Sequence, residues 1–156
     1  MKIPGWVDSS ATAVLTLQRF LFGVMFTLSG SMWFRRDDSV GYLRDALEGA
    51  LEEATATFGY EAFLRGVVLE WPTLFTGLVG VGELAVGVAL VTGLPPRLGA
   101  AAGVFLAVNY GLAFGGTILP PSGNFALAAL MLPLCLARPY RHLVVRLPGR
   151  QSSSMG

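Results

Sequence analysis

The apolar stretch from Pro72 to Arg97 most constrains what this chain can fold into. It is about as long as the ~20 residues that a helix needs to cross a bilayer. One carboxylate, Glu83, lies near its centre, and a Pro95-Pro96 pair precedes the final arginine. A charged side chain inside the membrane is costly unless it has a partner or a function. The stretch therefore predicts a transmembrane helix whose single acid needs an explanation.

Three further segments resemble this stretch in length and apolarity. The chain is 53% hydrophobic and 13% charged, with a mean hydropathy of +0.61, whereas a soluble domain carries about 25% charged residues. We therefore expect an all-α membrane protein, a four-transmembrane-helix bundle forming one domain over residues 1–150. The expected spans are about 11–34, 72–94, 98–119 and 124–137, and a disordered tail is expected at 151–156.

An amphipathic segment at about 38–68 separates the first two spans. Asp37, Asp38 and Ser39 are N-cap candidates, and apolar residues such as Leu43 and Leu47 follow at helical spacing with acids on the other face. A basic polar face, common in helices that bind anionic lipid, is missing. The segment is predicted to pack against protein at the outer end of the bundle.

Basic residues predict the orientation. With four spans, Lys2, Arg97 and the arginines after Ala137 would share one side of the membrane, and the acidic segment would lie on the other. The positive-inside rule then places both termini in the cytoplasm. We expect the chain to be integral to the cell (inner) membrane, and the resemblance described below implies a bacterial one.

Several kinds of chemistry are disfavoured by composition. The chain has one cysteine, Cys135, and one histidine, His142, which are too few for an intrachain disulfide or a metal, haem or iron–sulfur site. Basic residues do not interleave with aromatic ones along a stripe, so no nucleic-acid partner is expected. The expected partner is the lipid bilayer.

Arg19 and Glu83 are the two ionisable side chains well inside the predicted spans. Counted from the cytoplasmic ends of their helices they lie ~12 Å and ~16 Å deep, so neighbouring helices would bring them within reach. The first interpretation is a structural ion pair, with Gln18 or Asn109 satisfying the remaining hydrogen-bonding capacity.

Two other interpretations of this pair stay open. The pair could line a cavity for a polar-headed lipophilic molecule such as a quinone, with Arg19 binding a carbonyl oxygen and Glu83 handling protons. It could also belong to a proton or ion path. In the quinone hypothesis the catalytic candidates are Glu83 and Arg19, and the further cofactor-binding candidates are Gln18, Asn109, Tyr110 and, at the cytoplasmic mouth, Arg97.

Six aromatic residues lie near the predicted outer ends of the spans. They could line an aromatic pocket, but aromatic residues are also expected as a belt at the membrane interface. The belt is the preferred interpretation for Trp33, Phe34, Tyr60, Trp71, Phe75 and Tyr110.

A stripe of small residues marks the third predicted span. It recurs at every fourth position, a pattern that lets two helix backbones approach closely, either within one bundle or between copies of the chain. Its members are Gly99, Gly103, Ala107, Gly111 and Gly115.

A resemblance to a known family follows from motifs spread over roughly Leu17 to Ala137. They are Arg19-x-x-x-Gly23, Gly30, the acidic loop helix, Gly82-Glu83-Leu84, Gly87 and Gly93-Leu94-Pro95-Pro96-Arg97. Together they resemble the DoxX/DoxD-like family of small four-helix membrane proteins. Many relatives carry a lysine soon after the glycine near the end of the first span, which is Gly30 here, whereas this chain has Arg35 and Arg36.

The resemblance implies a membrane subunit of a quinone-linked oxidoreductase, as in thiosulfate:quinone oxidoreductase, with a quinone as cofactor and a soluble or membrane-bound redox partner. The outer loop has no histidine or cysteine to hold a sulfur compound, so quinone contact is favoured over thiosulfate chemistry. The alternatives are a non-catalytic scaffold that anchors a redox complex and a binder or carrier of a small lipophilic molecule. Assembly into homo-oligomers is compatible with all three.

Overall fold

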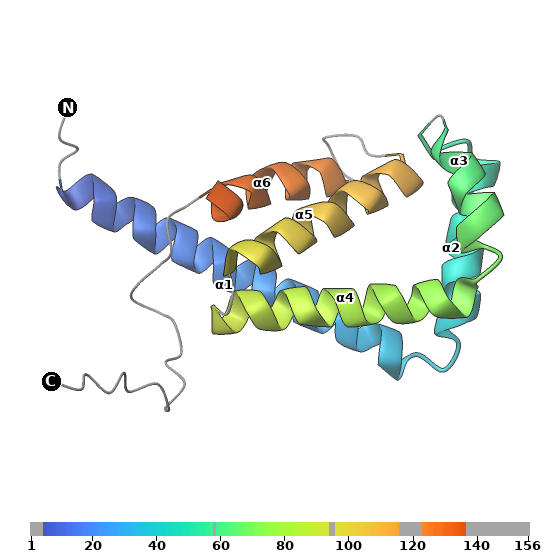
Figure 1. Ribbon diagram of the computed structural model, residues 1–156, viewed down its shortest axis with the longest axis horizontal. Coiled ribbons are helices and arrows are strands. Elements are labelled where there is room, and N and C mark those ends of the chain that lie inside the picture. Colours follow the sequence, from blue (N-terminus) through green and yellow to red (C-terminus); the bar gives the residue numbers. More distant parts are fainter. Residues whose placement is uncertain (1–4, 58, 94–95, 116–122, 137–156) are drawn as a thin grey trace, which may run out of the picture.

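The computed structural model describes residues 5–57, 59–93, 96–115 and 123–136, with side chains from Thr12 onward. The described residues are helical, with α1, α4, α5 and α6 running alongside one another and α2 and α3 lying across one end (Figure 1). The elements are α1 (Gly5–Arg35), α2 (Ser39–Glu52), α3 (Tyr60–Phe63), the π-helical turn η1 (Leu64–Val68), α4 (Pro72–Thr92), α5 (Pro96–Ala113) and α6 (Asn124–Leu136).

Two of these helices meet the length and apolarity expected of membrane spans, Thr12–Arg35 within α1 and Pro72–Thr92. The predicted all-α fold and membrane-helix character are therefore confirmed. The four-span bundle is not confirmed. Helix α5 has 18 residues but is less apolar than the two candidate spans, and α6 has only 13 residues, or ~20 Å of helix. The third span was predicted to reach residue 119, but α5 ends at Ala113. The tail predicted at 151–156 lies outside the described residues.

Large apolar side chains are exposed on all four long helices. An apolar surface of this extent is unusual for a monomeric soluble protein and suits contact with lipid. Examples are Leu17, Leu21 and Leu28 on α1, Leu78, Val81 and Val88 on α4, Leu98 and Phe105 on α5, and Leu130 on α6.

Helices α1 and α4 pack in direct backbone contact through glycines. A Cβ atom on Gly87 would lie 2.5 Å from the backbone nitrogen of Thr27, and one on Gly30 would lie 2.7 Å from that of Leu84. No side chain larger than hydrogen fits at such positions without moving a helix. The glycine motifs of the sequence thus fix the distance between these two helices.

The small-residue stripe of α5 packs within the protein. A Cβ on Gly103 would clash with the side chain of Met131, and one on Gly111 would lie 2.8 Å from the ring of Phe125. Both neighbours belong to α6. The stripe therefore serves helix packing inside one chain.

Helix α2 packs against protein, as predicted. Asp38 is its N-cap residue and accepts a hydrogen bond from the Gly41 amide at 2.7 Å. The apolar face of α2 is buried in a cluster formed with η1 and the end of α5. That cluster contains Leu43, Leu47, Leu51, Ala56, Leu64, Val68 and Ala113. A second cluster lies among the long helices and contains Phe26, Val86, Leu90, Ala100, Met131 and Leu134.

Candidate functional site

Glu83 is buried, with 3% of its surface exposed, and two aromatic side chains hold its carboxylate. The indole Nε1 of Trp33 donates to Oε2 at 3.1 Å, and the hydroxyl of Tyr110 donates to Oε1 at 2.6 Å. Trp33 lies on α1 and Tyr110 on α5, so the carboxylate joins three helices. Hydrogen bonds of this kind offset the cost of removing a carboxylate from water.

The predicted ion pair between Arg19 and Glu83 is not confirmed. Both side chains are 3% exposed, but the register of α1 and α4 separates them. Gly30 faces Glu83 and Leu84, whereas Gly23 faces Leu90 and Val91. Arg19 lies a further turn away, ~16 Å along α1 from the level of Gly30. The prediction assumed that the cytoplasmic ends of the two helices are level, but α1 begins at Gly5 and extends past the end of α4, because Gly23 already lies beside Leu90 and Val91.

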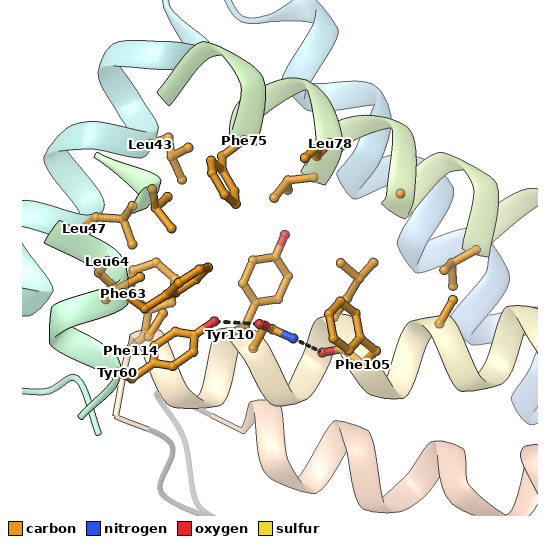
Figure 2. Close-up of a pocket in the computed structure, with 18 residues that line it drawn as sticks. Leu43, Leu47, Tyr60, Phe63, Leu64, Phe75, Leu78, Phe105, Tyr110 and Phe114 are labelled. Atoms are coloured by element: carbon orange, nitrogen blue, oxygen red, sulfur yellow. Dashed lines mark hydrogen bonds between the residues drawn. The ribbon is translucent and has the colours of Figure 1, made fainter. Parts of the chain in front are cut away.

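A cavity of about 470 Å³ lies between the two apolar clusters. Its wall is formed by α2, α3 and η1 on one side and by α4 and α5 on the other, as Figure 2 shows. Fifteen of its lining side chains are apolar or glycine, and the three polar ones are Tyr60, Asn109 and Tyr110. Glu83 is not part of the lining, so Tyr110 connects the cavity to the buried carboxylate.

Some of the side chains that line the cavity are also exposed on the surface of the protein. Leu78 on α4 is 56% exposed and Phe105 on α5 is 66% exposed, and both line the cavity. These residues belong to the apolar surface that suits lipid contact. The apolar surface that suits lipid contact therefore extends to the wall of the cavity at these two residues.

A second hydrogen-bonded pair lies on the cavity wall. The hydroxyl of Tyr60 donates to Oδ1 of Asn109 at 2.6 Å, and Nδ2 of Asn109 donates to the carbonyl oxygen of Phe105 at 2.7 Å (Figure 2). Burial raises the pKa of Tyr60 above its usual value, so its hydroxyl stays protonated at neutral pH and remains a hydrogen-bond donor.

The structure brings together only part of the predicted site. Glu83, Tyr110 and Asn109 lie at or next to the cavity. Gln18 instead donates to the carbonyl oxygen of Leu130 on α6. Arg97 is exposed at the start of α5, ~20 Å along that helix from Tyr110.

The aromatic residues divide between the two interpretations offered for them. Tyr60, Phe75 and Tyr110 line the cavity, in agreement with the pocket interpretation. Phe34 and Trp71 are 59% and 65% exposed, as belt residues would be.

Trp33 is the residue that sequence reasoning missed as a partner of Glu83. No local pattern indicates this contact, because the register of α1 on α4 sets it, and residues three apart lie on the same face of a helix. Trp33 follows Gly30 by three residues, and Gly30 is the position at which α1 meets Glu83.

Comparison with known proteins adds a family assignment. The model of the DoxX family matches residues 14–116, which is well over half of the chain and contains every residue that lines the cavity. Neither a curated protein nor a solved structure matches the chain. The match agrees with the apolar helices in indicating a membrane protein. On this evidence the chain belongs to the DoxX family.

Proposed function

We propose that this chain is the membrane subunit of a quinone-linked oxidoreductase and that the cavity between α2 and α5 binds the quinone ring. The observation that carries the proposal is a ligand-sized apolar cavity whose wall includes Tyr110, hydrogen-bonded to the buried Glu83. Family membership and the resemblance described above support it.

The cavity residues fit a quinone. A volume of about 470 Å³ lies within the ~300–1,000 Å³ typical of small-molecule sites. Apolar side chains such as Phe63 and Phe75 would pack on a ring, and the exposed Leu78 and Phe105 on the cavity wall would let an apolar tail reach the bilayer. Three polar side chains on the wall are available to ring oxygens.

A bound quinone would supply two-electron chemistry. The residues of this chain would bind and orient the ring, exclude water, and hold a proton at the Tyr110 hydroxyl beside Glu83. Electrons would come from a redox partner subunit, since one cysteine and one histidine do not form a redox centre.

Two glycines of α4 test this assignment. A Cβ on Gly82 would lie 3.8 Å from the nearest atom, Cδ1 of Leu106, and Gly82 lines the cavity. Leucine at this position should fill the cavity and reduce quinone co-purification by about tenfold or more, because the ring and the new side chain need the same space. Bound lipids would be extracted from the purified protein and analysed by mass spectrometry.

Gly77→Leu is the matched control, because a Cβ on Gly77 meets no atom within 4 Å and Gly77 does not line the cavity. Both changes replace glycine with leucine in the same helix, so effects of helix propensity are shared. Equal quinone content in the two variants, or no quinone in the wild-type protein, would refute binding in this cavity.

The carrier hypothesis is the second candidate, and the same cavity favours it. A carrier would bind apolar molecules irrespective of redox chemistry, and its polar groups would be needed only at the rim. Retention of many unrelated lipids, with no preference for quinones, would favour this function. A scaffold was expected to have a sealed Arg19–Glu83 pair, so it has less support.

We also propose the orientation in which α2 faces outward, in the inner membrane, with both termini in the cytoplasm. In a Cys135→Ala background, a cysteine at Glu53 should react with an impermeant maleimide added to intact cells. A cysteine at Arg97 should react only after permeabilisation. Both positions are exposed. The reverse labelling pattern would overturn the orientation.

A further inference from the structure

Hydrogen bonds around Glu83 have a fixed direction. The indole nitrogen of Trp33 can only donate, and it donates to Oε2 of Glu83, while the Tyr110 hydroxyl donates to Oε1. The single proton of Tyr110 is therefore used in this bond. Because this proton points away from the cavity, the remaining lone pairs of the Tyr110 oxygen are what the cavity can use.

The hydroxyl of Tyr60 also donates its proton away from the cavity, in this case to Asn109. The backbone carbonyl of Phe105 can only accept, so it fixes the amide nitrogen of Asn109 on its own side. Oδ1 of Asn109 then faces Tyr60 and accepts the proton of its hydroxyl. Tyr60 thus also presents only acceptor lone pairs beyond this bond.

The cavity is consequently richer in acceptors than in donors. Among its lining side chains, two phenolic oxygens are left as acceptors, and one amide proton of Asn109 is left as a donor. We infer that the cavity selects a ligand that donates hydrogen bonds, so that a hydroquinone binds more tightly than the corresponding quinone. This inference rests on the proposed function, because it assumes that the cavity binds a ring of this class.

The arrangement predicts that one substitution reverses the preference. In Glu83→Gln, the donor-only Trp33 would require the amide oxygen of the new side chain, which turns its NH₂ group toward Tyr110. Tyr110 would then accept from this group, and its own proton would be directed into the cavity. A quinone carbonyl could accept that proton, whereas a hydroquinone would lose an acceptor.

Tetramethyl-1,4-benzoquinone and its hydroquinone form a suitable matched pair of probes. Their binding to the full chain in lipid nanodiscs would be measured by equilibrium dialysis under anaerobic conditions. For the wild-type protein we expect the hydroquinone to bind about tenfold more tightly, as one net hydrogen bond of ~1.4 kcal/mol would give. The dimethyl ether of the hydroquinone, which has no donor, should lose this advantage.

Three variants test whether the direction of the hydrogen bonds, and not only the presence of the tyrosine hydroxyls, sets the preference for the hydroquinone. Glu83→Gln should bring the ratio to unity or below, with tighter binding of the quinone. Tyr110→Phe should reduce the preference for the hydroquinone without reversing it, because Glu83, which loses the Tyr110 proton, does not line the cavity. Tyr60→Phe should change the preference less, because it frees Oδ1 of Asn109 as an acceptor on the cavity wall. Tyr110→Phe, together with the dimethyl ether probe on the wild-type protein, keeps the inference testable if Glu83→Gln does not fold.

Each outcome has a distinct meaning. Equal or tighter binding of the quinone by the wild-type protein would refute the inference and leave the proposed function intact. An unchanged ratio in Tyr110→Phe would also refute it. Failure of both probes to bind the wild-type protein would instead contradict the proposed function.

Discussion

Gly87→Leu is expected to lower the free energy of unfolding by about 3 kcal/mol or more, because overpacking costs 1–3 kcal/mol even where side chains can adjust. Here the obstacle is backbone. A Cβ on Gly87 would lie 2.5 Å from the Thr27 nitrogen and 2.9 Å from the Gly23 carbonyl oxygen. Helix α1 would have to move away from α4, which would also separate Trp33 from Glu83.

Unfolding in mixed micelles with increasing denaturing detergent, followed by tryptophan fluorescence, measures this loss. Gly77→Leu makes the same chemical change ten positions earlier in α4, where a Cβ meets nothing within 4 Å. It should be neutral or slightly stabilising, since leucine favours the helix more than glycine does. Equal stability of the two variants would contradict the close packing of α1 on α4.

Glu83→Leu is expected to destabilise the protein by about 2–4 kcal/mol. The leucine would leave the Trp33 indole N–H and the Tyr110 hydroxyl without their acceptor, and each stranded polar group costs ~1–3 kcal/mol. Glu83→Gln should cost much less, because its amide can accept from Trp33 and donate to Tyr110. The same unfolding measurement compares the two variants.

A double mutant provides the internal control for this prediction. Adding Tyr110→Phe to Glu83→Leu removes the hydroxyl that lacks an acceptor. The double mutant should therefore regain about 1 kcal/mol or more of the free energy of unfolding. Tyr110→Phe in the wild-type background should instead be destabilising. If Glu83→Gln lowered the free energy of unfolding as much as Glu83→Leu, the prediction would be contradicted. The carboxylate would then need its charge for a partner, as the ion-pair interpretation proposed.

Much of the fold was predictable from local pattern. The length and apolarity of Pro72–Thr92 predicted a membrane helix, and the Asp38 N-cap and the spacing of Leu43 and Leu47 predicted an amphipathic helix packed on protein. The four-residue repeat from Gly99 predicted close packing. These features depend on residues near one another in the chain, so the sequence displays them directly.

The site was predictable in part. An isolated acid within an apolar helix must find hydrogen-bond partners, so Glu83 stood out without a structure. Tyr110 and Asn109 were also identified. The partner of Glu83 was wrongly predicted as Arg19, and Trp33 was overlooked.

The sequence by itself determined that Glu83 needs a partner and that α1, α4 and α5 carry the glycines for close approach. Only the tertiary structure decided which partner it has. Gly23 and Gly30 set the register of α1 on α4, and a shift of one helical turn would move a side chain by ~5 Å. That displacement exceeds the length of a hydrogen bond. The register therefore brings Trp33 to the carboxylate and leaves Arg19 more than two turns away.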